Sequence, residues 1–177
     1  MVGVKGANAK GVLYVDDIAF YKHTPASEQV VSWFEAESGN VAAPMQVYSN
    51  DPSASAGQYI GTEDAGVVGD RTDGVTTYNF TVQGGTYKLI FRVITGTTDG
   101  SNSFWVRIPD ATAPVITEND GWINTNPMSY SETWIWDVIG GNDAVEFTIP
   151  AGTHTLQVAY REDGAYLDAI AIVLVTE

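Results

Sequence analysis

Short segments in which apolar and polar residues alternate run through almost the whole chain, separated by turns rich in glycine and aspartate. Residues 76–82 alternate in this way up to Gly84-Gly85, which is expected to form a turn. Residues 86–95 follow as a strand that is apolar on both faces. Pro150-Ala151-Gly152 is expected to form a second tight turn between two strands. Long helical periodicity is absent. This pattern predicts an all-β fold, a β-sandwich (jelly roll) of two antiparallel sheets.

The composition favours one domain of ordinary size and excludes several classes of function. The chain has 177 residues, 44% of them hydrophobic, which is enough for a core. It has no cysteine, so disulfides, thiol nucleophiles and thiolate metal sites are excluded. No stretch has the pattern of a membrane span or of a signal peptide. With 22 acidic residues against 8 lysines and arginines, the formal charge is -14. Nucleic acid and anionic membranes are therefore unsuitable partners, although the charge is also explained by solubility alone.

The N-terminal part of the chain differs from the rest. Residues 11–21 form a further strand-like segment that resembles the closing segment, 166–175, and Thr24-Pro25-Ala26-Ser27 has the composition of a linker. Residues 1–25 are therefore either the tail of a preceding, related domain or a strand added at a sheet edge. The sequence leaves both open. Residues 26–177 are predicted to form the β-sandwich.

Three carboxylates are the candidates for a metal site. Glu35 and Glu37 lie two residues apart in a predicted strand, so their side chains are expected on the same face. If the first and last strands pair, Asp168 reaches the same point. Clustered carboxylates repel one another and call for a cation, and hard oxygen ligands favour calcium. The alternative is two solvent-facing glutamates and an aspartate in a turn.

Residues 119–136 form a loop that is rich in aromatic side chains. Trp122, Tyr130 and Trp134 lie outside the predicted strands, which is costly unless they pack or bind a ligand. Aromatic rings that cover the apolar face of a sugar, beside polar groups such as Asn124, are a common means of carbohydrate recognition. Three other aromatic residues are expected in the core: Trp33, Phe104 and Trp136.

Four motifs follow one another along the chain at a characteristic spacing. They are Glu35-Ala36-Glu37, the small-residue loop 53–60, the strand and turn of 80–89, and the closing hairpin and strand of 149–156 and 167–170. In this order they resemble the β-sandwich carbohydrate-binding modules of families 6 and 35, in the galactose-binding-like superfamily. The resemblance covers residues 34–174. Two features depart from the family 6 pattern: residues 61–74 replace an aromatic and acidic segment, and Tyr166 stands near the place of an asparagine. Ligand specificity is therefore not carried over.

The resemblance implies a metal, a ligand site and a cellular setting. Glu35, Glu37 and Asp168 would hold a structural calcium ion together with backbone carbonyls of a neighbouring loop. Trp134 is the match to the ligand-stacking tryptophan of a loop-end site. The family context implies a module of a larger, multidomain polysaccharide-degrading enzyme that is secreted, extracellular and of bacterial type.

Other residues are candidate sugar contacts for which a structural role is the open alternative. Asp163 and Tyr166 lie in the turn that borders the loop-end site, or form a plain hairpin turn. Trp105 shares a strand face with Arg107 and is a candidate for a second, concave site, unless the two stack for structural reasons. Arg71 is the only cation of a long acidic loop, where it contacts a ligand or pairs with a carboxylate.

The predicted function is that of a non-catalytic carbohydrate-binding module. No carboxylate pair is flanked by the aromatic subsites of a glycosidase cleft, and His23 and His154 have no nucleophile partner. The negative charge favours agar-type galactan, mannan, xylan or β-glucan over a polyanion, while Arg71, Arg107 and Arg161 leave uronic acids open. The alternative is a structural or adhesion β-sandwich that makes protein contacts.

Overall fold

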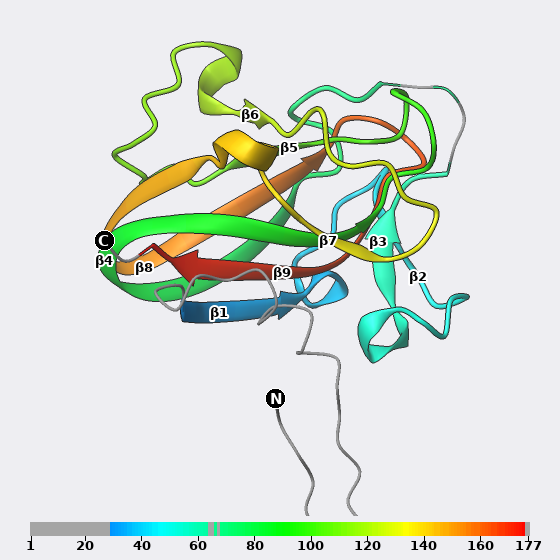
Figure 1. Ribbon diagram of the computed structural model, residues 1–177, viewed down its shortest axis with the longest axis horizontal. Helices are drawn as coiled ribbons and strands as arrows, with labels where there is room; N and C mark the ends of the chain where they lie inside the picture. The colour runs from blue at the N-terminus through cyan, green and yellow to red at the C-terminus, as the bar shows by residue number, and fades with distance from the viewer. Residues whose placement is uncertain (1–28, 64–65, 67, 176–177) are drawn as a thin grey trace, which may run out of the picture.

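The computed structural model describes residues 29–63, 66 and 68–175, and the prediction for residues 1–25 lies outside them. Nine strands make up the described fold (Figure 1): β1 (Gln29–Glu35), β2 (Gln46–Tyr48), β3 (Tyr59–Gly61), β4 (Thr76–Ile94), β5 (Phe104–Arg107), β6 (Ile123–Asn124), β7 (Ile135–Val138), β8 (Glu146–Tyr160) and β9 (Tyr166–Leu174). Its helices are single 3-10 turns: η1 (Ala36–Ser38), η2 (Ser55–Gly57), η3 (Asn119–Gly121) and η4 (Gly141–Asp143). Within the described ranges no helix has the length and apolar character needed to cross a membrane.

All strand pairings are antiparallel, and they connect the two layers of the sandwich. The strands follow the order β2-β3-β9-β4-β8-β5-β6, with β1 also paired to β9 and β7 also paired to β4. β4 is 19 residues long and β8 is 15. The first part of β4 pairs with β8, and its last part pairs with β9 and β7, so these long strands pass from one layer to the other (Figure 1). The predicted all-β sandwich is confirmed.

Both predicted glycine turns are wrong, because each segment lies inside a strand. Gly84 and Gly85 belong to β4, and Pro150-Ala151-Gly152 belongs to β8. The two segments face each other, with Gln83 opposite Ala151 and Gly85 opposite Ile149. The φ angles of 87° at Gly84 and 154° at Gly85 are available to glycine and bend the strand without ending it. Because of the bend, the first part of β4 lies in one layer and the last part lies in the other.

Alternation along β4 builds the core on both sides of this bend. Its inward side chains are all buried: Tyr78, Phe80 and Val82 before the bend, and Leu89, Phe91 and Val93 after it. They pack in one cluster with Leu156 of β8 and with Ile170 and Ile172 of β9. Phe104 is buried in the same cluster, as predicted. The core therefore fills the space between the two layers.

Trp33 and Trp136 were predicted in the core, and the structure places them elsewhere. Trp33 is opposite Ala171 in β9, and Trp136 is opposite Arg92 in β4. Both positions face away from the inward residues of β4, because side chains alternate between faces. The two rings contact each other with centroids 4.9 Å apart, and Trp33 is 38% exposed. They stand on the outer face of the sheet.

The first and last strands of the described chain pair, as the carboxylate prediction required. Gln29 is opposite Leu174, and Glu35 is opposite Ala169. On its other side β9 pairs with β4, and the register skips Asp168: Arg92 is opposite Ala169, and Val93 is opposite Leu167. Such a β-bulge leaves one residue unpaired and re-aims its side chain. Here the bulge directs the Asp168 carboxylate to Arg92.

Candidate functional site

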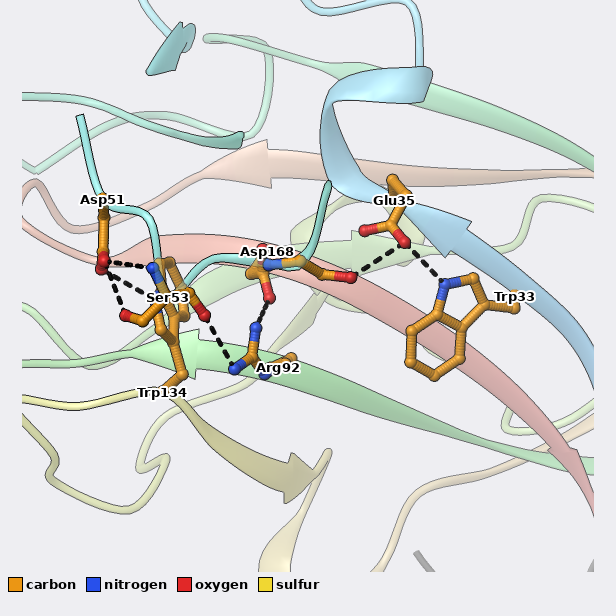
Figure 2. Close-up of polar contacts among 8 residues, drawn as sticks. Trp33, Glu35, Asp51, Ser53, Arg92, Trp134 and Asp168 are labelled. Carbon is orange, nitrogen blue, oxygen red and sulfur yellow. Dashed lines mark hydrogen bonds and ion pairs between the residues drawn. The ribbon is translucent and has the colours of Figure 1, made fainter. Parts of the chain in front are cut away.

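The carboxylate of Asp168 is the centre of a buried polar network. This carboxylate is completely buried. It accepts a hydrogen bond from the Ser55 backbone N–H at 2.8 Å and forms an ion pair with Arg92 Nη1. Glu35 Oε1 accepts bonds from Ser55 Oγ at 3.0 Å and from Trp33 Nε1 at 3.3 Å (Figure 2). Ser55 therefore ties the first strand to the last.

Glu37 reaches this network from a 3-10 turn, so the prediction that it continues the strand is wrong. β1 ends at Glu35, and the chain turns through η1, where Ala36 is fully buried and its carbonyl accepts a bond from Tyr78 Oη at 2.7 Å. Burial raises the pKa of Glu37, and the negative charges of Glu35 and Asp168 raise it further. The charges of Glu35 and Asp168 therefore act on Glu37, while the predicted metal site stays a prediction.

The chemistry of this cluster fits a hard cation in part. Glu35 Oε2 and Glu37 Oε2 are buried without a hydrogen-bond partner, which is costly for a carboxylate unless a cation is near. Burial raises the pKa of Asp168 to about 6, although Arg92 and the Ser55 N–H act to lower it. As the side chains stand, no three His, Cys, Asp or Glu residues of the described ranges are arranged to hold one metal ion. Asp168 is engaged by Arg92 instead.

Arg92 extends the network to a tryptophan. Its Nη2 donates to the Ser53 carbonyl at 3.2 Å, and its Cζ lies 5.5 Å from the ring centroid of Trp134. Trp134 Nε1 donates to Asp51 Oδ2 at 2.9 Å, and Asp51 Oδ1 accepts from the Ser53 backbone N–H at 2.8 Å. Figure 2 shows the contacts that lead from Trp134 through Asp51 and Ser53 to Arg92, and from Arg92 to Asp168.

An aromatic cluster adjoins Trp134 on the same side of the molecule. Tyr59 packs edge-on against Trp134 at 5.2 Å and against Tyr166 at 5.3 Å between ring centroids. Tyr48 stacks on Tyr59 at 5.2 Å because the two residues are directly opposite in β2 and β3. The sequence prediction named Trp134 and Tyr166 but not Tyr48 or Tyr59. The alternation of side chains along β2 and β3 was the only sequence pattern that could have placed Tyr48 and Tyr59 on the same face as Trp134.

A second cluster lies on the outer face of β5 and β8. Arg107 Nε donates to Gln157 Oε1 at 2.8 Å, its Nη1 donates to the Asp120 carbonyl at 3.0 Å, and its Cζ lies 4.6 Å from the ring centroid of Trp122. Arg71 Nη2 pairs with Asp120 Oδ2 at 3.0 Å. These five residues line a cavity of about 410 Å³.

Trp105 lies beside this cavity, with two guanidinium groups over its ring. The Cζ atoms of Arg71 and Arg161 are 5.8 and 5.6 Å from the ring centroid, and Trp105 Nε1 donates to the Gly69 carbonyl at 3.4 Å. Every arginine of the sequence thus lies over a tryptophan ring. The three tryptophans proposed as sugar platforms are each partly covered by a cation.

Comparison with solved structures gives the fold a class. A family 35 carbohydrate-binding module from Clostridium thermocellum is 18% identical, with a TM-score of 0.54 over 80% of this chain and 98% of that one. A second module, from Cellvibrio mixtus lichenase 5A in complex with cellotriose, is 19% identical, with a TM-score of 0.54 over 84% of this chain and 100% of that one. This chain has the β-sandwich fold of carbohydrate-binding modules of families 6 and 35.

The same fold occurs as part of a longer enzyme. An exo-β-1,3-galactanase from Phanerochaete chrysosporium, in complex with β-1,3-galactotriose, is 16% identical, with a TM-score of 0.54 over 84% of this chain. The chain spans only 30% of that enzyme's length. No protein-family model and no curated protein matches the sequence.

Within this module fold, the predicted sugar-binding residues fall into separate groups. Trp134 and Tyr166 join the aromatic cluster beside β3, whereas Arg71, Trp105 and Trp122 gather at the outer face of β5 and β8. Trp122 is only 4% exposed, so it forms the floor of the cavity. The loop 119–136 does not bring its aromatic residues to one point.

Of the remaining three candidates, Asn124 borders the second cluster, because it is directly opposite Trp105 in the pairing of β5 with β6. Asn124 is exposed in β6, and its Oδ1 accepts a bond from the Asn126 N–H at 2.9 Å. Tyr130 is 50% exposed and donates to Asp99. Asp163 is buried and, with Tyr160, lines a different cavity of about 430 Å³.

Proposed function

We propose that this chain is a non-catalytic carbohydrate-binding module. The observation that supports this most directly is the cavity at the outer face of β5 and β8. Arg71 and Arg107 supply donors there, Asp120 and Gln157 supply acceptors, and the ring of Trp122 forms the floor. Hydrogen-bonding groups of both kinds beside an aromatic ring suit a sugar, whose hydroxyls donate and accept around an apolar face. As proposed, the module is secreted by a bacterium and directs an appended polysaccharide-degrading enzyme to its substrate outside the cell.

The charges of the cavity favour a neutral polysaccharide. Arg71 is paired with Asp120 at 3.0 Å and with Asp70 at 3.5 Å, so the cavity holds as many carboxylates as guanidinium groups. The whole chain carries a formal charge of -14 and repels polyanions at long range. Agar-type galactan, mannan, xylan and β-glucan are therefore the proposed ligands.

Affinity electrophoresis against these soluble polysaccharides tests the function. We expect at least one neutral polymer to retard the protein, and Gln157→Ala to weaken that binding about tenfold, as loss of one or two hydrogen bonds does. Trp134→Ala tests the aromatic cluster in the same gel. Gln83→Ala, at an exposed position of β4, is the matched control and should bind as the unchanged protein does.

Two outcomes would redirect the assignment. If Trp134→Ala abolishes binding and Gln157→Ala does not, the ligand binds at the aromatic cluster. If no glycan retards the protein, a structural or adhesion role is the better reading, and the exposed Val30 and Val31 on β1 are the first surface to test.

We also propose that the carboxylate cluster binds a structural calcium ion. The support is the pair of buried, unpartnered oxygens Glu35 Oε2 and Glu37 Oε2, to which Asp168 would add a third carboxylate. The ion would neutralise the mutual repulsion of these groups and fasten β1 to β9.

Thermal unfolding with and without a chelator tests the calcium proposal. An ion present at 100 times its Kd stabilises the folded state by about 2.7 kcal/mol, so EDTA is expected to lower the Tm by several degrees. Added CaCl2 should restore the Tm, and Glu37→Gln should make the protein less sensitive to EDTA. An unchanged Tm in EDTA would rule out the ion.

A further inference from the structure

Arg92 occupies a junction between two sites that the sequence analysis treated separately. It lies on the outer face of β4, opposite Ala169 of β9 on one side and Trp136 of β7 on the other. Its guanidinium contacts the carboxylate of Asp168, the carbonyl of Ser53 and the ring of Trp134 (Figure 2). One side chain therefore touches both the carboxylate cluster and the candidate sugar-stacking ring.

The guanidinium and a divalent cation would compete for the same carboxylate. Asp168 is fully buried, and its oxygens are used by Arg92 and by the Ser55 backbone N–H. A cation held by Glu35, Glu37 and Asp168 needs these oxygens, and its charge also repels the guanidinium at close range.

We propose that Arg92 couples cation binding at the carboxylate cluster to the position of Trp134. Cation binding displaces the guanidinium from Asp168, while the guanidinium keeps its contacts with the Ser53 carbonyl and the Trp134 ring. The ring and the Asp51 loop therefore shift with it, and Arg92 lowers the affinity of the cluster for the cation. The inference rests on the proposed calcium site and is independent of which glycan binds.

Two indole N–H groups report on the two ends of this network. Trp33 Nε1 donates to Glu35 Oε1 at 3.3 Å, so it senses the cation directly. Trp134 Nε1 donates to Asp51 Oδ2 at 2.9 Å and senses the cation only through the coupling. In the 15N-labelled chain their NMR signals can be assigned with Trp33→Phe and Trp134→Phe.

The experiment is a CaCl2 titration of the unchanged chain, Arg92→Gln and Lys88→Gln, followed by NMR and by calorimetry. Lys88 is a matched control, because it is another cation of β4 on the same face and pairs with Glu146 at 3.6 Å. We expect both indole signals to move in the unchanged chain and in Lys88→Gln. In Arg92→Gln only the Trp33 signal should move, and calcium should bind about tenfold more tightly, because a competing positive charge is gone.

The outcomes separate this inference from the calcium proposal. If the Trp33 signal moves and the Trp134 signal does not, calcium binds but the coupling is absent. If both signals move as far in Arg92→Gln as in the unchanged chain, Arg92 is not the residue that couples them. Absence of both the shifts and the heat of binding refutes calcium and coupling together. If Arg92→Gln fails to fold, Arg92→Lys replaces it and should show a reduced Trp134 shift, since lysine lacks the fork that spans Asp168 and Ser53.

Discussion

Gly61 allows an aromatic ring to pack closely against the backbone of β3. It is opposite Tyr166 in the pairing of β3 with β9, and the tyrosine ring lies against its backbone. A Cβ at this position would be 2.5 Å from Tyr166 Cδ1 and 2.9 Å from the Ala165 carbonyl oxygen. The latter is backbone and cannot move aside as a flexible side chain can. The packing of Tyr166 in the aromatic cluster therefore requires a residue without a side chain at position 61.

Gly61→Ala is expected to lower the free energy of unfolding by about 1–3 kcal/mol, the usual effect of overpacking. Gly100→Ala is the control, because the nearest atom to its added Cβ is 4.0 Å away. Urea unfolding measures both variants. Equal stability of the two would mean that Tyr166 repacks freely, and the aromatic cluster would then not be a fixed surface.

The sequence named several residues of the candidate sites but did not predict which residues contact one another. The nearness of Glu35 and Asp168 was predicted on the condition that the first and last strands pair, and the resemblance supplied that condition; the two strands do pair. The arginine partners were not predictable in this way. Arg71 reaches Trp105, and Arg92 reaches Trp134, across more than thirty residues of sequence, so only the register of the folded sheet brings them together.

At the scale of elements, β4 determines how the two layers are joined. Strands were predicted on both sides of Gly84-Gly85, alternating in residues 76–82 and apolar on both faces in residues 86–95, but the glycines were interpreted as a turn. The composition of a bend and that of a turn are alike, since both use the wide φ range of glycine. What distinguishes them is the partner strand: β8 carries Pro150-Ala151-Gly152 at the matching register, so the ladder continues.

β4 pairs with strands of both layers, so a substitution that leaves a cavity in the core next to β4 should destabilise both layers together. Leu89 is fully buried in the core, and Leu89→Ala is expected to cost about 2–5 kcal/mol of unfolding free energy. Gln83→Ala, exposed on the same strand, should change stability by less than about 0.5 kcal/mol. Denaturation followed by both fluorescence and circular dichroism tests this. Separate transitions from the two probes would show that the layers unfold independently.

At the scale of the molecule, the charge distribution is more informative than the net charge. The formal charge of -14 suggested only solubility and a preference for neutral partners. In the structure all four arginines lie over tryptophan rings. Three of them also pair with carboxylates: Arg71 with Asp70 and Asp120, Arg92 with Asp168, and Arg161 with Glu162. The predicted fold class is confirmed because alternation and the order of the motifs are properties of the whole chain. Two candidate sites were also proposed from the sequence, one at the loop end and one beside Trp105. The sequence did not predict that loop 119–136 contributes Trp122 to one cluster and Trp134 to the other, because this depends on the path of the loop.

The pairing of β1 with β9 has a mechanical consequence. Gln29 and Leu174 are directly opposite at one end of this antiparallel pair, and Glu35 and Ala169 are opposite at the other end. A force that pulls residues 29 and 174 apart loads the hydrogen bonds one after another, as in unzipping, and not all together, as in shear. β1 therefore peels from the end that carries Val30. The end beside Ser55 separates last, so the polar network of Glu35, Ser55 and Asp168 is the final point of resistance to tension.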